Sequence, residues 1–358
     1  MCGILFALKC KNTTLFNNKL EQLKHRGSDD MNIIMGENFI AGATQIRVSQ
    51  TPIIHPIQVG DWIIMYEGIT KDADDIIEIL NGQHPDKWLL DGCFAGVLYN
   101  IKKGDLHVLR NGYPLYIEEN EEEIWVCSEK KLLNNPSLIE EKKIRHLDTY
   151  GKTFQDAFDK HLNEIHVPFG IILNNFESCI IIDMILSSGV YLKWNPVHTY
   201  SVRMDCDQSH HIIDQLDTEH YEYVYNAKEA LESIRDVIYT IEDYEVEKVR
   251  SAIPIYLLAK HMKKMGIKVV FSTSNYDVYG ANAIQCRNPL MDSIAQNYMS
   301  NDYKHVFDLG FSLKDIQFKE SSSLITLLQD HAEKVLLIEY DDKESVLYES
   351  IYKELFGV

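Results

Sequence analysis

The sequence predicts two folded parts, a mostly β part over residues 1–152 and an α/β part over residues 153–358. Short β-type runs separated by turns fill the first part. In the second part buried strands alternate with long amphipathic helices, and this alternation predicts a parallel sheet covered on both faces. The end of the chain is helical in pattern. A length of 358 residues is sufficient for two or three domains with substantial cores.

The first part is predicted from runs with strand composition. It opens with an apolar, partly alternating strand over residues 2–9, and a helix is expected over Asn17–Lys24, ending before Gly27. The acidic run 118–123 predicts a solvated hairpin tip. Further strands are expected at Asn38–Ala43, Trp62–Tyr66, Gly92–Asn100, Leu106–Arg110 and Glu123–Ser128.

The second part is predicted to place its chemistry in two loops. Ligands bind beyond the carboxyl ends of parallel strands, which here means the loops after Leu173 and Phe271. The strands are expected at Val167–Leu173, Val197–Val202 and Ile267–Ser272, and the helices at Phe154–Glu164, Lys228–Glu242 and Ile253–Met265.

The composition is typical of a globular protein and excludes several classes of partner. A net charge of −19 argues against nucleic acid and anionic membranes, because both require basic patches. The best apolar stretch, Cys179–Leu186, is short and contains Asp183, so no membrane span is predicted. No secretory signal is recognisable, and the seven cysteines form no Cys-x-x-Cys pair. We therefore expect a cytoplasmic protein without a metal site or disulfide framework.

Cys2 has the composition of a catalytic nucleophile. An initiator Met is removed when the next residue is small, so the mature chain could begin with Cys2, which would carry a thiol and a free α-amine. The amine, with a reference pKa of about 7.7–8.0, could take the thiol proton. The same dipeptide is also consistent with the simple start of a strand.

Ten segments of the chain match the motifs of one known family, in the same order. They are Met1–Ile4, His25–Asp29, Gln45–Val48, Asp91–Ala95, Pro114–Tyr116, Ser128–Leu132, Val167–Gly170, Val249–Pro254, Arg287–Asp292 and Tyr348–Phe356. Together these segments resemble the glutamine-hydrolysing asparagine synthetases. The resemblance implies an N-terminal-nucleophile amidotransferase domain with αββα layers, which would release ammonia from glutamine. It also implies an ATP-pyrophosphatase-type domain that would adenylate aspartate, joined to the first by a tunnel.

In the amidotransferase half, the resemblance implies that Cys2 attacks the glutamine carboxamide. Arg47 falls where the family holds the glutamine α-carboxylate, a task suited to a bidentate guanidinium, although a surface charge on a strand is the alternative. Arg26 and Asp29 are expected to organise the site. Asp74 or Asp75 lies near the position of the aspartate that binds the substrate α-amine, or is a solvated helix-start residue.

One departure concerns the oxyanion. The family places an asparagine and a glycine there, whereas this chain has Tyr66, Glu67 and Gly68. An ionised carboxylate cannot donate a hydrogen bond, and its charge opposes a developing oxyanion. Loss of one such donor costs about 10²–10³ in rate. Tyr66 could donate through its hydroxyl, with a different geometry.

The synthetase half departs further from the family. Asn174 and Asn175 replace the start of the glycine-rich phosphate loop, and Phe176 adds bulk. Ser178 replaces a metal-ligand aspartate, for which the neighbouring Glu177 is an alternative ligand. The second nucleotide signature keeps Asp277 but loses its glycines and glutamates. The remaining matches of this half, each of which can also be scaffold, are Arg250, Ser251, Ser272 and Lys319.

These changes concentrate in the loops that carry chemistry. The family uses ATP and Mg²⁺, and the altered loops predict that ATP-dependent synthesis is lost. Whether glutaminase activity survives is left open, as is the oligomeric state, with a homodimer or hetero-oligomer among the choices. The alternatives are an inactive binding or regulatory protein and a stand-alone N-terminal-cysteine amidohydrolase acting on glutamine or another small amide.

Overall fold

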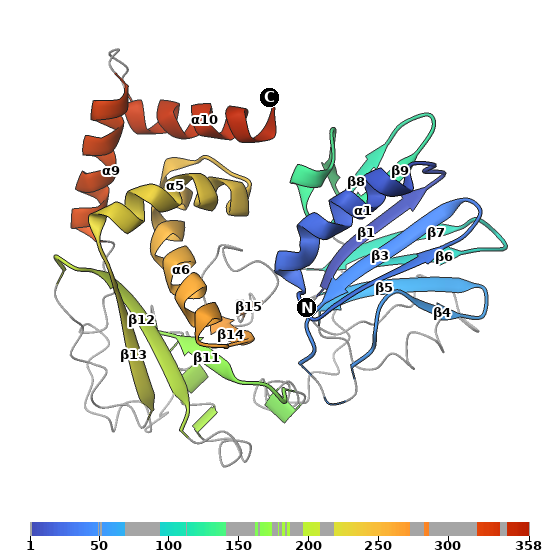
Figure 1. The fold of residues 1–358 in the computed structure, drawn as a ribbon, viewed down its shortest axis with the longest axis horizontal. Coiled ribbons are helices and arrows are strands. Elements are labelled where there is room, and N and C mark those ends of the chain that lie inside the picture. Colours follow the sequence, from blue (N-terminus) through green and yellow to red (C-terminus); the bar gives the residue numbers. More distant parts are fainter. Residues whose placement is uncertain are drawn as a thin grey trace, which may run out of the picture. The chain divides into compact units, whose positions relative to one another are not determined.

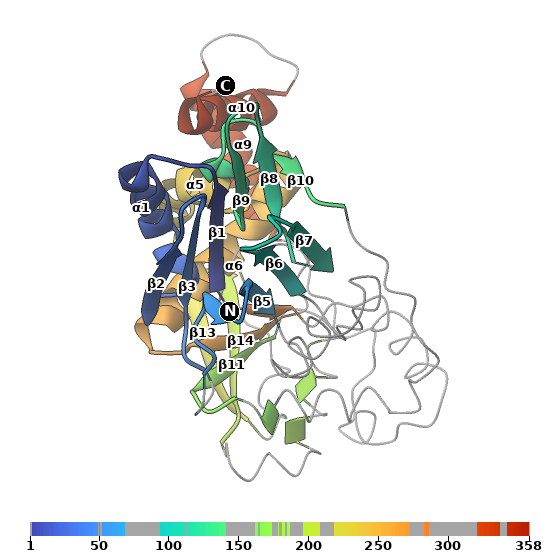
Figure 2. The same ribbon diagram turned by 90° about the vertical axis from the view of Figure 1, so that its right-hand side faces the viewer.

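A computed structural model gives the fold as two compact units, residues 1–157 with 164–166, and residues 158–163 with 167–358. Each unit is described on its own (Figures 1 and 2). The described residues are 2–48, 50, 52–68, 94–111, 113–140, 162–163, 165–173, 178, 181–182, 185–186, 196–207, 218–272, 283–285, 321–336 and 342–357.

Unit 1 contains a six-stranded antiparallel sheet with its first strand near the middle. The strand order is β10-β8-β9-β1-β3-β2, so β1 lies between β9 and β3 (Figure 2). The strands are β1 (Cys2–Leu8), β2 (Asp30–Met35), β3 (Phe39–Gln45), β8 (Tyr116–Glu119), β9 (Ile124–Cys127) and β10 (Ser137–Leu138).

A second, four-stranded antiparallel sheet packs on this one. Its order is β4-β5-β6-β7, and a shared core joins Ile4 and Phe6 of β1 to Met65 and Val97. The opposite face of β1 packs against helix α1 (Thr13–Gln22). Three layers follow: helix, six-stranded sheet and four-stranded sheet. The second sheet consists of β4 (Ile57–Val59), β5 (Trp62–Gly68), β6 (Phe94–Asn100) and β7 (Leu106–Asn111).

The predicted strands of unit 1 are confirmed, and the helix prediction needs correction. Helix α1 begins at Thr13 rather than Asn17, because the side chain of Asn12 accepts the backbone N–H of Leu15 at 2.9 Å and caps the helix. A 3₁₀ turn, η1 (Leu23–Arg26), then leads to Gly27. The hairpin tip predicted between two strands is confirmed, since β8 and β9 pair antiparallel on either side of residues 120–123. The strands β2, β4 and β10 were not predicted; β4 and β10 are short and β2 lies at a sheet edge with mixed exposure.

Unit 2 contains the predicted parallel sheet. Its order is β13-β12-β11-β14-β15, with all neighbours parallel. The chain builds outward from β11 through β12 to β13, and then continues on the other side of β11 with β14 and β15. The direction therefore reverses between β11 and β14. The strands are β11 (Phe169–Ile172), β12 (His198–Met204), β13 (Glu219–Tyr225), β14 (Val269–Ser272) and β15 (Ala283–Gln285).

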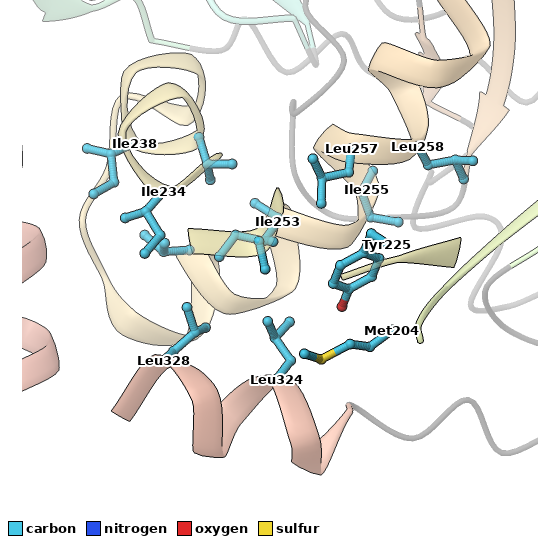
Figure 3. Close-up of a cluster of buried hydrophobic side chains, with 14 of the residues drawn as sticks. Met204, Tyr225, Ile234, Ile238, Ile253, Ile255, Leu257, Leu258, Leu324 and Leu328 are labelled. Carbon is cyan, nitrogen blue, oxygen red and sulfur yellow. The ribbon is translucent and has the colours of Figure 1, made fainter. Parts of the chain in front are cut away.

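Four described helices share one core with the sheet. Leu324 and Leu328 of α9 face Ile234 of α5 and the strand-end residues Met204 and Tyr225 (Figure 3). Burial of this apolar set ties the C-terminal helices to the sheet. The helices are α5 (Ala227–Ile241), α6 (Val246–Lys264), α9 (Ser322–Val335) and α10 (Lys343–Phe356).

Two predictions for unit 2 are wrong. Helix α6 begins at Val246 rather than Ile253, and Pro254 lies inside it. The helix continues through the missing N–H of proline because Ile253 before it and Ile255 and Leu258 after it are buried in the common core. The last part of the chain is not wholly helical, since β15 adds a strand to the sheet.

One further prediction for unit 2 can be compared with the structure only in part, and one strand of the unit was not predicted. Of the helix expected at 154–164, only residues 162–163 are described, and both are helical. Strand β13 was not predicted. No helix in the described part of the chain has the length and apolar character needed to cross a membrane.

Candidate functional site

The N-terminal cysteine begins the central strand β1, at the end of the six-stranded sheet where the ends of β1, β2 and β3 lie side by side. Cys2 pairs with Gln45 of β3, and Gln45 pairs on its other side with Asp30 of β2. Arg47 follows Gln45 by two residues. The antiparallel register therefore brings the start of β1, the start of β2 and the end of β3 into one row.

Two glycines allow the close packing that builds this end of the sheet. A Cβ atom at Gly27 would lie 2.2 Å from the backbone N of Gln45, so the turn after η1 can approach β3 only without a side chain. A Cβ atom at Gly3 would lie 2.7 Å from Thr44 Oγ1 and 2.9 Å from Leu23 Cβ. The glycine that follows Cys2 therefore has a packing reason as well as a motif match.

Arg47 is held by two consecutive aspartates. Its Nε and Nη2 donate to Asp30 Oδ2 and Oδ1 at 2.7 and 2.6 Å, a bidentate ion pair. Its backbone N–H donates to Asp29 Oδ2 at 3.0 Å. The Arg47 side chain is 55% exposed. Hydrogen bonding from Arg47 lowers the pKa of Asp30.

Glu67, one of the two residues predicted at the altered oxyanion position, is buried and paired with Arg26. Arg26 Nη2 donates to Glu67 Oε2 at 3.2 Å, and both side chains are almost fully buried. Glu67 lies on the same face of β5 as Ile63 and Met65, which pack in the core between the two sheets. The charge of Glu67 is thus balanced inside the unit by an arginine from the 25–29 motif.

Arg26 also belongs to a larger polar group, the cluster of Arg26, Glu67, Glu129 and Lys131, which are buried, with the exposed His25 at its margin. Glu129 Oε1 lies 3.3 Å from Arg26 Nη1 and accepts from His25 Nε2, and Glu129 Oε2 lies 3.0 Å from Lys131 Nζ. Burial alone would raise the pKa of Glu129, but the hydrogen bond from His25 and the charges of Arg26 and Lys131 lower it well below its usual range. The cluster joins the segments 25–29, 66–68 and 128–132.

A second contact at this end of unit 1 involves His55, which sequence reasoning missed. Its ring packs edge-on against Tyr66, with ring centres 4.4 Å apart, and its backbone N–H donates to Gln45 Oε1 at 2.8 Å. Burial lowers the pKa of His55 to about 4, so the ring is neutral at pH 7. In the sequence, the only local signal at His55 is the proline that follows it; in the structure the His55–Pro56 peptide bond is cis.

In unit 2 the reversal of strand order lies between β11 and β14, at the loops predicted to carry chemistry. Ser272 ends β14, pairs with Gln285 and is buried, and Ser178 is also buried. No group of three or more His, Cys, Asp or Glu side chains that could hold a metal occurs among the described residues. The predicted site residues Asp74, Asp75, Asn174, Asn175, Asp277 and Lys319 lie outside the described residues.

Arg250 and Ser251 lie in the second turn of α6. Arg250 forms a bidentate pair with Glu344 of α10, with Nε to Oε1 at 3.0 Å, and Tyr348 Oη donates to the same Oε1 at 2.8 Å. Ser251 Oγ donates back to the carbonyl of Glu247. The Arg250 guanidinium therefore joins two helices of the unit.

A polar group on β12 and β13 was also missed. His220 Nδ1 lies 2.9 Å from Thr199 Oγ1, and His220 Nε2 lies 2.9 Å from Ser201 Oγ. These side chains alternate with Tyr200 and Tyr221, which face the helices and stack with ring centres 5.3 Å apart. Hydroxyls thus satisfy both ring nitrogens within the sheet.

The geometry defines a two-unit protein in which a cysteine-initiated antiparallel sandwich accompanies a parallel α/β sheet. The asparagine synthase family model matches residues 151–274. "Asparagine synthetase [glutamine-hydrolyzing] 2" of Lotus japonicus is 24% identical over 346 aligned residues, covering 77% of this chain and 59% of the relative. "Asparagine synthetase B [glutamine-hydrolyzing]" of Escherichia coli K12 is 25% identical over 360 residues, covering 78% and 64%.

The chain is similar to glutamine-hydrolysing asparagine synthetases over about three quarters of its length, and the asparagine synthase family model matches part of its second half. A further relative, "Probable asparagine synthetase [glutamine-hydrolyzing]" of Dictyostelium discoideum, is 23% identical over 260 residues, covering 58% of this chain and 46% of the relative. The chain spans about three fifths of the length of the first two relatives, at 59% and 64%.

Proposed function

We propose that unit 1 is an N-terminal-nucleophile amidohydrolase with the αββα type of fold, and that it releases ammonia from glutamine through Cys2. The observation that carries the proposal is the register that aligns Cys2, Gln45 and Asp30 at one end of the sheet, with Arg47 two residues beyond. A nucleophile and a carboxylate-binding guanidinium at one end of the sheet suit an amide substrate with an α-carboxylate.

The proposed reaction uses the two functional groups of a processed Cys2. The α-amine takes the thiol proton, and the thiolate adds to the carboxamide carbon. The tetrahedral intermediate collapses as the amine returns a proton to the leaving nitrogen, which departs as ammonia. Water, activated by the same amine, then cleaves the thioester and yields glutamate and free Cys2.

The role of Glu67 in this reaction is to remain paired with Arg26. An unpaired carboxylate beside the developing oxyanion would oppose it, whereas the Arg26–Glu67 pair balances that charge. The backbone N–H of Gly68, next to Glu67, remains as the expected oxyanion donor. With one oxyanion donor in place of the family's two, we expect hydrolysis to be about 10²–10³ slower than in an enzyme with both donors.

For unit 2 we propose that the ATP-dependent reaction is lost. The residues at the nucleotide loops do not fit the group, because Asn175 and Phe176, after Asn174, stand for the two glycines that approach phosphate, and Ser178 stands for a metal-ligand aspartate. Arg250, a matched residue, is already paired with Glu344. Incubation with ATP, Mg²⁺ and aspartate is expected to give no AMP or pyrophosphate, and formation of either would contradict this part.

The test of unit 1 is glutamine hydrolysis by the full chain and by Cys2→Ala. Ammonia and glutamate are expected in equal amounts from the parent chain and to be absent for Cys2→Ala. Cys206→Ala is the matched control, since Cys206 is an exposed thiol in unit 2. Intact mass after treatment with a glutamine-analogue electrophile should show Met1 removal and one adduct that depends on Cys2. Equal rates for the parent chain and Cys2→Ala would refute the proposal.

A further inference from the structure

The guanidinium proposed to receive the substrate carboxylate already holds a carboxylate of its own chain. Asp30 engages Arg47 through two parallel hydrogen bonds of 2.7 and 2.6 Å, the fork geometry that a guanidinium makes with a bound carboxylate group. The oxygen atoms of Asp30 thus stand where the α-carboxylate oxygens of an amino acid could stand.

The fold fixes this contact from both sides. Asp30 is the first residue of β2 and pairs with Gln45, two residues before Arg47. Asp29 accepts the backbone N–H of Arg47 at 3.0 Å. The Asp30 side chain is 13% exposed and that of Arg47 is 55% exposed. The carboxylate is therefore held in place while the guanidinium remains accessible to a ligand.

The local charge opposes a second anion. Asp30 places a carboxylate on the Arg47 guanidinium, and Asp29 accepts the backbone N–H of the same residue, so two carboxylates lie beside this arginine. An amino acid that brings its own carboxylate meets these negative charges and must compete with Asp30 for the guanidinium donors. An amide that lacks the carboxylate meets no such competition.

We infer that Asp30 is a specificity-determining residue that acts as an internal competitor for the α-carboxylate of glutamine. This inference rests on the proposed amide hydrolysis in unit 1. Asp30 weakens binding of amino-acid amides relative to small primary amides that carry no α-carboxylate. Because exposed ion pairs contribute little, the competition is modest, and it is expected to change affinity about two- to fivefold.

The test compares two ligands and two charge variants of the full chain. The ligands are L-glutamine and 4-aminobutanamide, which is glutamine without its α-carboxylate. Dissociation constants are measured by calorimetry in Cys2→Ala and in Cys2→Ala/Asp30→Asn, so that no turnover is required. Asp61→Asn in the Cys2→Ala background is the matched control, because Asp61 pairs with exposed Lys102 at 2.9 Å elsewhere in unit 1.

Asp30→Asn is expected to tighten L-glutamine about two- to fivefold and to leave 4-aminobutanamide unchanged, while Asp61→Asn alters neither. Weaker glutamine binding in Asp30→Asn would show that Asp30 orients Arg47 for the substrate, and would overturn the inference. An equal change for both ligands, or no glutamine binding in any variant, would overturn it too. If Asp30→Asn tightens glutamine binding as expected but the parent chain with Cys2 does not hydrolyse glutamine, the proposed function alone is refuted.

Discussion

Each unit contains an arginine–carboxylate group in a segment that matches a site motif of the family, and the two groups differ in burial and in the segments that they join. In unit 1, Arg26 joins Glu67 and Glu129, which lie next to the ends of β5 and β9. In unit 2, Arg250 joins Glu344 and, through it, Tyr348, all of which are helical.

The difference shows that a residue can match a family motif without forming part of a binding site. The unit 1 cluster connects the turn η1 to the end of β5 and to the segment after β9, so it links the two sheets of the unit. The unit 2 pair holds α6 to α10, which is a packing role that needs no ligand. The presence of the motif arginine Arg250 therefore has a structural explanation that requires no ligand.

Replacing Arg26 by Met is expected to have the largest effect. It removes the guanidinium that lies between two buried carboxylates, and loss of one partner of a buried ion pair costs about 3–5 kcal/mol. Denaturant unfolding would measure the loss, and hydrogen exchange would locate it in β1, β5 and β9. Lys102→Met is the control, because its pair with Asp61 is 76% and 45% exposed and contributes at most about 1 kcal/mol. Equal effects of both variants would refute the distinction.

Acid is expected to weaken unit 1 through His55. The folded pKa of about 4 lies below the unfolded value of about 6.5, so the unfolded chain binds more protons between them. The contribution of neutral His55 is full above pH 6.5 and is lost as the pH falls to 4, by about 3 kcal/mol.

His55→Gln should flatten this pH dependence. Unfolding free energies at pH 7, 5.5 and 4 would be compared for the parent chain and the variant. Below the usual range of glutamate, near pH 4, both proteins should lose further stability, because the folded pKa of Glu129 is lowered by its partners and the unfolded state takes up the proton first. An unchanged slope above pH 4 in His55→Gln would contradict the assignment.

Replacing Glu344 by Ala is expected to have the smallest effect of the three, about 2–3 kcal/mol. Arg250 and Tyr348 both lose an acceptor, but the Arg250 side chain is 18% exposed and can be hydrated. Faster hydrogen exchange in α6 and α10 with unchanged ammonia release from glutamine would support a packing role. Glu354→Ala, which removes the exposed pair with Arg235, is the control and should leave exchange in both helices unchanged. A fall in ammonia release with Glu344→Ala would contradict the comparison.

Local patterns in the sequence were sufficient for much of the fold. Strand composition located β1, β3, β5, β6, β7 and β9, and the strand–helix alternation predicted the parallel sheet. Edge strand β2 carries both Asp30 and the pairing with Gln45, yet its mixed exposure hid it from pattern reasoning. Pro254 likewise gave no sign that the burial of its neighbours would carry α6 through it.

The sequence by itself was sufficient to predict two parts, to recognise the resemblance to asparagine synthetases and to single out Cys2 as the candidate nucleophile. Only the tertiary structure decided which charges meet. Asp30 is one of 54 acidic residues and looks ordinary in the sequence, but strand register places it on Arg47. Glu67 reads as a misplaced charge until folding brings Arg26, 41 residues away, against it. Periodicity is a local property, whereas pairing of charges depends on register and packing between distant segments.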